Sequence, residues 1–116
     1  MTNIFSNPLS LFNLRNKVAL ITGASGAFGT VAAKALAGAG CKLVLAAGNN
    51  DALKKVSEDC KILGAEVVTI NLRHDSEINC NELINATIKN FEKLDILVVA
   101  SGINSVAKIE DMELEV

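Results

Sequence analysis

The sequence predicts an α/β protein with a three-layer, doubly wound parallel sheet, of which it supplies four strands. Two observations lead to this prediction. Short apolar runs rich in β-branched residues alternate with longer segments of helical periodicity. In addition, the first apolar run leads directly into a glycine-rich turn that opens a helix.

The predicted strands are short runs that are apolar along their whole length. They are Lys17–Thr22, Lys42–Ala46, Glu66–Ile70 and Asp95–Ala100. Such runs are typical of parallel strands whose two faces are both covered by helices. Right-handed crossovers between them give the expected strand order 3-2-1-4, the first part of a Rossmann-type sheet.

Three helices are expected between these strands. The first, from Phe28 to Ala39, offers apolar residues at helical spacing, namely Phe28, Val31, Ala32, Ala35, Leu36 and Ala39. The second starts at a cap formed by Asn49, Asn50 or Asp51, ends by Gly64, and has an apolar stripe of Leu53, Val56, Cys60 and Leu63. The third starts at Ser76 and Glu77, and its apolar side is Ile84, Ile88 and Phe91.

Composition excludes several classes of protein. The net charge of −2 gives no basic surface for nucleic acid or for an anionic membrane. The three cysteines are odd in number and none is at metal-ligand spacing, so we expect reduced, idle thiols and no metal site. No signal peptide or membrane-spanning run is visible, and a cytoplasmic protein is the default expectation.

The glycine-rich turn is the strongest functional signal. It is Thr22-Gly23-Ala24-Ser25-Gly26-Ala27-Phe28-Gly29. Gly23 suits a turn conformation that side chains disfavour, a small residue in the middle lets the backbone approach a diphosphate, and Gly29 lets the helix pack close to the sheet. Free N–H groups and the helix dipole would then favour phosphate groups.

The stretch LRNKVALITGASGAFG, from Leu14 to Gly29, resembles the opening of short-chain dehydrogenases/reductases. The segment FEKLDILV, from Phe91 to Val98, is similar to the family's FGRLDILV. The loop reads TGxxGxxG where the family usually has TGxxxGxG, so Ala27 stands where the middle glycine is expected. The family's Asn-Asn-Ala-Gly is replaced by Val99-Ala100-Ser101-Gly102.

The resemblance implies an NAD(P)-binding Rossmann domain over residues 14–116, preceded by an N-terminal arm over residues 1–13. The expected cofactor-binding residues are Gly23, Ser25, Gly26, Ala27, Phe28, Gly29, Ala47, Gly48, Asn49, Asn71, Leu72, Ala100, Ser101 and Gly102. Among them, Asn71 and Leu72 align with the pair that contacts adenine. The cofactor is NADP or NAD. NADP is favoured because no acid follows the second strand to repel a 2′-phosphate, although no Arg or Lys stands there to hold one.

The family's chemistry uses Asn, Ser, Tyr and Lys residues that lie after the fourth strand, with Tyr transferring the hydroxyl proton. This sequence has no tyrosine, so we expect the catalytic half to be missing and assign no catalytic residue. The single histidine, His74, is expected to be a solvated loop residue rather than a base.

By resemblance, the function is therefore an NAD(P)-dependent oxidoreductase that interconverts carbonyls and alcohols. Its implied partners are the nicotinamide dinucleotide and a small carbonyl or alcohol, and a homo-oligomer is compatible with the family. One alternative is a non-catalytic nucleotide-binding module. The other is a methyltransferase-like domain, against which Ala47 and Gly48 argue, because such domains normally have an acid at the end of the second strand.

Overall fold

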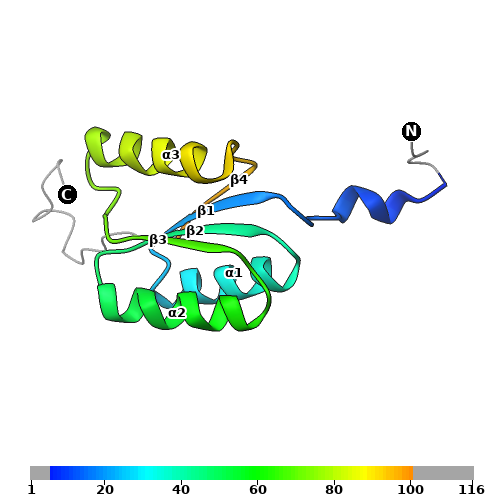
Figure 1. Ribbon diagram of the computed structural model, residues 1–116, viewed down its shortest axis with the longest axis horizontal. Helices are drawn as coiled ribbons and strands as arrows, with labels where there is room; N and C mark the ends of the chain where they lie inside the picture. Colours follow the sequence, from blue (N-terminus) through cyan, green and yellow to red (C-terminus); the bar gives the residue numbers. More distant parts are fainter. Residues whose placement is uncertain (1–5, 101–116) are drawn as a thin grey trace, which may run out of the picture.

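The computed structural model describes residues 6–100 of the chain. After a short 3₁₀ helix, η1 (Pro8–Phe12), strands and helices alternate (Figure 1). They are β1 (Val18–Thr22), α1 (Ala27–Gly38), β2 (Lys42–Ala46), α2 (Asn50–Ile62), β3 (Val67–Ile70), α3 (Glu77–Phe91) and β4 (Ile96–Val99). The predicted order of elements is confirmed, and each strand limit agrees with the prediction to within one residue.

The strands form one parallel sheet in the order β3-β2-β1-β4, as predicted. Their carboxyl ends are in register, because Thr22 of β1 pairs with Ala46 of β2 and with Val99 of β4, and Ala46 pairs with Ile70 of β3. The loops that follow these strands therefore all leave the sheet on the same side, at the carboxyl ends of the strands. The candidate functional site lies at these carboxyl ends.

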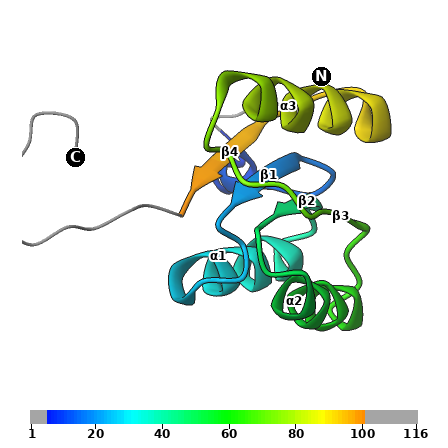
Figure 2. The same ribbon diagram turned by 90° about the vertical axis from the view of Figure 1, so that its left-hand side faces the viewer.

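Helices cover both faces of the sheet, with α1 and α2 on one side and α3 on the other (Figures 1 and 2). Alternate residues of the central strands point to each side. Ala19, Ile21, Leu43 and Leu45 pack toward α1 and α2. Leu20, Val44 and Ala46 pack toward Leu83 of α3. This two-sided burial explains why the central strands are apolar throughout.

The apolar stripe predicted for α1 is wrong at most positions, although Leu36 is partly buried against the core as expected. The residues of α1 that face the sheet are Gly29, Ala33 and Ala37, which recur every four residues. Phe28 is instead 82% exposed, and Val31 is also exposed. The helix lies so close to the β1–α1 turn at its start that no side chain fits at Gly29, and Phe28 and Val31 are left on the outer side.

The stripes of the other two helices are correct only in part. In α2, Leu53, Val56 and Cys60 are buried as expected, but Leu63 ends the helix and is half exposed. In α3 the buried residues are Leu83 and Thr87, with Ile84 and Phe91 partly buried beside them. The hydroxyl of Thr87 donates to the Leu83 carbonyl oxygen at 2.8 Å, which is how a polar residue is accommodated there.

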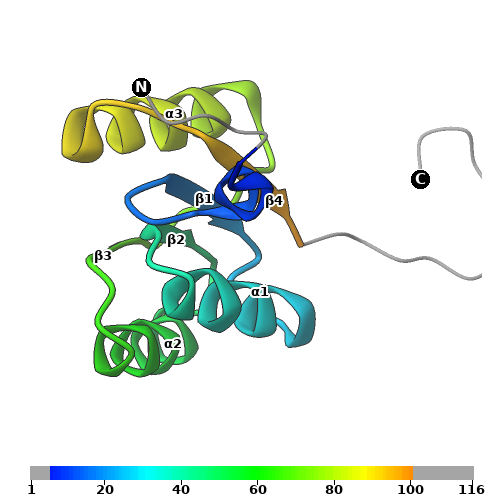
Figure 3. The same cartoon turned by 90° about the vertical axis from the view of Figure 1, so that its right-hand side faces the viewer.

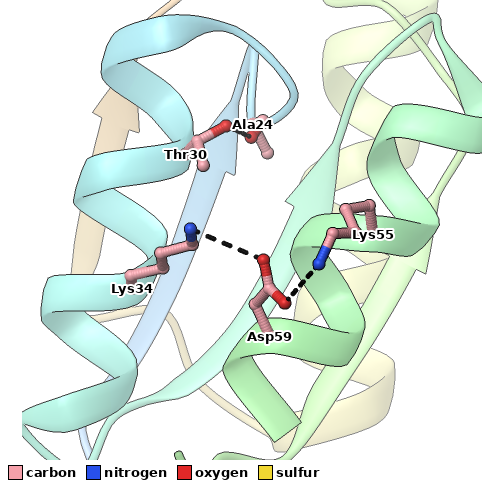
Figure 4. Close-up of polar contacts among 5 residues, drawn as sticks. All are labelled: Ala24, Thr30, Lys34, Lys55 and Asp59. Atoms are coloured by element: carbon pink, nitrogen blue, oxygen red, sulfur yellow. Dashed lines mark hydrogen bonds and ion pairs between the residues drawn. The ribbon is translucent and has the colours of Figure 1, made fainter. Parts of the chain in front are cut away.

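Polar contacts join α1 to helix α2 and to the turn that precedes α1 (Figure 4). Asp59 of α2 accepts from Lys55 on the same helix at 2.9 Å and lies 3.5 Å from the Lys34 Nζ atom of α1. The side chain of Thr30 donates to the Ala24 carbonyl oxygen at 3.2 Å. The hydrogen bond from Lys55 and the charges of both lysines hold the pKa of Asp59 below its usual value.

The 3₁₀ helix η1 lies apart from the sheet and the other helices in Figure 1, on the side that faces the viewer in Figure 3, and none of its residues is buried. The cysteines at 41 and 60 are buried free thiols, and burial raises the pKa of each. Within residues 6–100, no helix is both long enough and apolar enough to cross a bilayer.

Candidate functional site

A cleft of about 650 Å³ opens at the carboxyl ends of the strands. Its size is within the usual range of small-molecule sites. Parallel α/β sheets bind ligands at this edge, where neighbouring loops diverge. The cleft is lined by Gly23, Ser25, Gly26, Ala46, Ala47, Gly48, Asn49, Leu72, Arg73, His74, Asp75 and Ala100.

The turn between β1 and α1 has the geometry that the sequence predicted. Gly23 has φ of 67°, in the left-handed region, and its carbonyl oxygen accepts from the Gly26 amide at 3.1 Å. A Cβ atom on Gly29 would collide with the Gly23 carbonyl oxygen and would lie 2.9 Å from the Ala24 Cα atom. As predicted, Gly23 is needed for its left-handed φ, and Gly29 is needed because no Cβ atom fits beside the turn.

The amino end of α1 differs from those of the other two α-helices. Asn49 caps α2 by accepting from the Ala52 amide, and Ser76 caps α3 by accepting from the Asn79 amide. Gly26 caps α1 without a side chain, and among residues 6–100 no side-chain oxygen is found to accept from the amides of the first turn. These amides and the positive end of the helix dipole face the cleft side of the turn, where an anion is stabilised.

The wall of the cleft formed by the loops after β2 and β3 is held in place by Asn71. Its side-chain Nδ2 atom donates to the carbonyl oxygens of Ala47 and Gly48 at 3.2 and 3.3 Å. The loop after β3 is thereby tied to the loop after β2. Asn71 itself does not line the cleft.

Three residues of the cleft wall were not expected there. Arg73, His74 and Asp75 follow β3 and line the cleft. His74 is half buried rather than fully solvated. No Arg or Lys directly follows β2 in the sequence, but the Arg73 guanidinium, from the loop after β3, lies against Gly48. Sequence spacing gave no sign of this contact, which depends on the pairing of β2 with β3.

Most of the predicted cofactor-binding residues come together in this cleft. Those in its wall are Gly23, Ser25, Gly26, Ala47, Gly48, Asn49, Leu72 and Ala100. Ala27, Phe28 and Gly29 form the first turn of α1 beside it. Ser101 and Gly102 lie outside the described residues.

The donor set fits a dinucleotide. An uncapped helix end supplies amide donors for a diphosphate, and the close approach at Gly29 keeps that end against the sheet. The walls formed by Ala47, Gly48 and Leu72 are apolar or backbone, as an adenosine requires. Within the described part of the chain, no group of three His, Cys, Asp or Glu residues is arranged to hold a metal ion.

The four-stranded order and the glycine turn define a Rossmann-type fold. A sequence profile of the short chain dehydrogenase family matches residues 17–116. The chain therefore belongs to the short-chain dehydrogenase/reductase family.

Individual relatives agree with this assignment. An uncharacterized oxidoreductase of Mycobacterium tuberculosis is 42% identical over 107 residues, which is 92% of this chain and 39% of that protein. The crystal structure of a short-chain type dehydrogenase/reductase from Mycobacterium marinum superposes with a TM-score of 0.83 and 34% identity, over 92% of this chain and 43% of that one. The structure of an NAD⁺-bound xylitol dehydrogenase matches with a TM-score of 0.70 and 30% identity, over 72% of this chain and 32% of that one. The chain thus spans less than half the length of each of these relatives.

Proposed function

We propose that this chain supplies the nicotinamide-dinucleotide site of an oxidoreductase that interconverts a carbonyl and an alcohol. The observation that carries the proposal is the uncapped amino end of α1, which follows the tight Gly23 turn at the cleft. The membership of the family and the NAD⁺-bound structural relative support the same ligand class.

Each part of the cleft has a distinct task in this proposal. The first-turn amides of α1, from Ala27 to Gly29, bind the diphosphate, and the helix dipole stabilises its charge. Ala47, Gly48 and Leu72 enclose the adenosine end. Asn71 keeps those two walls together through its hydrogen bonds. When bound, the nicotinamide ring gives or accepts a hydride.

We infer a preference for NADP over NAD. The loop after β2 reads Ala47-Gly48-Asn49, and a carboxylate there would repel a 2′-phosphate. We assign no proton donor for the carbonyl oxygen within this chain, because the sequence contains no tyrosine.

The test is a titration of the purified protein with NADPH, NADH and S-adenosylmethionine, followed by nicotinamide fluorescence and calorimetry. We expect both nicotinamide nucleotides to bind, NADPH more tightly, and S-adenosylmethionine not to bind. Binding of S-adenosylmethionine alone, or of none of the three at millimolar concentration, would contradict the proposal. Tighter binding of NADH than of NADPH would contradict only the preference.

A substitution of Gly26 makes this test sharper. A Cβ atom there would lie 3.4 Å from the Gly23 carbonyl oxygen, which is an ordinary contact. Asp is also a preferred N-cap residue, so Gly26→Asp is expected to leave α1 at least as stable while placing a negative charge against the diphosphate. Affinity for NADPH and NADH should fall together. Gly38→Asp, in open space at the other end of α1, is the matched control and should leave both affinities unchanged.

A further inference from the structure

The side chain of Arg73 occupies the space beside Gly48 where a larger residue would place its side chain. A Cβ atom on Gly48 would collide with the Nε atom of Arg73 and would lie 2.6 Å from Cζ and 2.7 Å from Nη2. Both residues line the cleft. The guanidinium is therefore packed on the backbone of the loop after β2, at the adenosine end of the proposed site.

The pairing of β2 with β3 brings these two residues together. Ala46 is in register with Ile70, and the Ala47 amide donates to the Ile70 carbonyl oxygen at 3.3 Å. The hydrogen bonds from Asn71 to Ala47 and Gly48 extend this connection beyond the strands. The chain then turns sharply, with the Leu72 amide donating to the Ile70 carbonyl oxygen at 2.9 Å, so the residue that follows reaches back over Gly48.

The guanidinium has no ion-pair partner in the described part of the chain. The ion pairs found there join Lys34 and Lys55 to Asp59, and Lys93 to Asp95. Asp75 lines the same cleft, but it is not within ion-pair distance of Arg73, and its Oδ1 atom accepts from Asn79 Nδ2 at 2.8 Å. A planar cation with several N–H donors is thus available beside the loop after β2, Ala47 to Asn49, which contains no acid.

We propose that Arg73 binds the 2′-phosphate of NADP(H), and that Gly48 is needed because it leaves room for the guanidinium. This inference rests on the proposed function, since it assigns a residue to one part of the same ligand. The diphosphate and the 2′-phosphate then have separate partners, the α1 amides and the Arg73 side chain. A guanidinium suits this role because it donates two parallel hydrogen bonds to a phosphate.

The test compares adenosine 2′,5′-bisphosphate with 5′-AMP, which differ only in the 2′-phosphate, and also NADPH with NADH. Binding is measured by calorimetry for the wild type, Arg73→Gln and Arg15→Gln. Arg15 is exposed and lies beside Gly40, at the opposite end of the sheet, so its substitution removes the same charge without touching the cleft. The circular dichroism spectra of the variants check that the fold is retained.

Arg73→Gln should lower the affinity for adenosine 2′,5′-bisphosphate and for NADPH by about 10- to 100-fold, the usual effect of losing a hydrogen-bonded charge. Affinity for 5′-AMP and NADH should change by less than about threefold, a shift well below one such interaction. The Arg15→Gln variant should behave as the wild type. In ³¹P NMR of bound NADP⁺, the 2′-phosphate resonance should move toward its free position in Arg73→Gln.

Equal weakening of both members of each pair would overturn the inference, because it would show that Arg73 contacts the adenine or supports the fold. An unchanged NADPH affinity would overturn it as well. In either case the proposed function stands as long as the wild type binds both nicotinamide nucleotides. A wild type that binds neither would overturn both proposals.

Gly48→Ala tests the positioning role. Gly48 does not have a left-handed φ, so the backbone tolerates alanine, and the Cβ must displace the guanidinium. We expect it to weaken adenosine 2′,5′-bisphosphate binding in the wild type and to have little further effect in Arg73→Gln. Additive effects of the two substitutions would show that Gly48 does not act through Arg73.

Discussion

The glycines of the β1–α1 turn are required by backbone geometry at the level of single atoms. Gly29 has no room for a Cβ atom, because the Gly23 carbonyl group and the Ala24 backbone fill that space. Backbone atoms cannot rotate away as a side chain can, so the turn and the start of α1 must move together if this residue is changed. Gly38, in the same helix, has nothing within 4 Å of a Cβ position.

These two glycines give a matched pair of substitutions. Gly29→Ala should lower the free energy of unfolding by about 1–3 kcal/mol, as overpacking typically does, and should weaken dinucleotide binding. Gly38→Ala should leave binding unchanged and raise the free energy of unfolding by up to about 1 kcal/mol, the difference in helix propensity. Urea denaturation measures both, and equal effects of the two variants would contradict the role given to Gly29.

At the same scale, the sequence is a good guide to some residues and not to others. The turn at Gly23 and the close approach at Gly29 follow from a local pattern of glycines, which is why the sequence alone predicts them. The contact of Arg73 with Gly48 could not be predicted, because it arises from strand pairing between distant segments. The same is true of the hydrogen bonds by which Asn71 ties the two loops.

Among the elements, α3 is attached to the sheet through few fully buried side chains. It covers one face of the sheet alone, and Leu83 is its one fully buried large apolar side chain among the described residues, packed with Leu20 and Val44. Leu83→Ala should cost about 2–5 kcal/mol of unfolding free energy. Ile78→Ala, on the exposed side of the same helix, should cost less than about 0.5 kcal/mol. Similar losses for both would contradict this packing.

The helices also show where periodicity alone misleads. The pattern in α2 predicted its buried side well because its polar residues mark the outer side clearly. In α1 nearly every residue is small or apolar, so the pattern did not distinguish the two sides. The buried side is that of Gly29, Ala33 and Ala37, because α1 packs close to the sheet. The distance between helix and sheet is set only when the layers assemble, so the sequence pattern of one helix does not reveal it.

At the scale of the whole molecule, two carboxylates join elements that are distant in the sequence. Asp95 accepts from the Val18 amide at 2.9 Å and lies 3.2 Å from Lys93, and so connects the starts of β4 and β1. The hydrogen bond from Val18 lowers the pKa of Asp95, with help from Lys93. Asp59 connects α2 with α1, and the hydrogen bond from Lys55 lowers its pKa.

These shifts predict an acid-sensitive contribution to stability. A carboxylate whose pKa is lowered by folding stabilises the protein at pH values above the pKa of the unfolded state, about 3.9 for Asp. This contribution disappears as the pH falls through the pKa of the folded state. The wild type should therefore have a larger free energy of unfolding at pH 7 than a variant that carries both Asp59→Asn and Asp95→Asn. This difference should shrink below about pH 4. Urea denaturation from pH 7 to pH 3 measures it, with Glu66→Gln as the control for an exposed carboxylate. A constant advantage at all pH values would contradict the assignment.

The sheet has one further property that single elements do not reveal. In β4, Ile96 and Val98 pack on the α1 side, whereas Leu97 and Val99 on the α3 side are 54% and 57% exposed. Strand order and two-sided layering were predictable from alternating patterns and right-handed crossovers, since these rules apply to all such sheets. How much of each outer strand the helices cover was not predictable, because it depends on where α3 lies over β1 and β2.

The central claim is that a nicotinamide dinucleotide binds where the β1–α1, β2–α2 and β3–α3 loops meet. Its most direct test is a two-dimensional ¹H–¹⁵N NMR titration of the protein with NADP⁺. We predict that amide signals of Gly23 to Gly29, Gly48 and Arg73 shift, and that those of Gly40 and Gly64, at the other end of the sheet, do not. Shifts confined to the end of the sheet near Gly40 and Gly64, or no shifts at saturating NADP⁺, would contradict it.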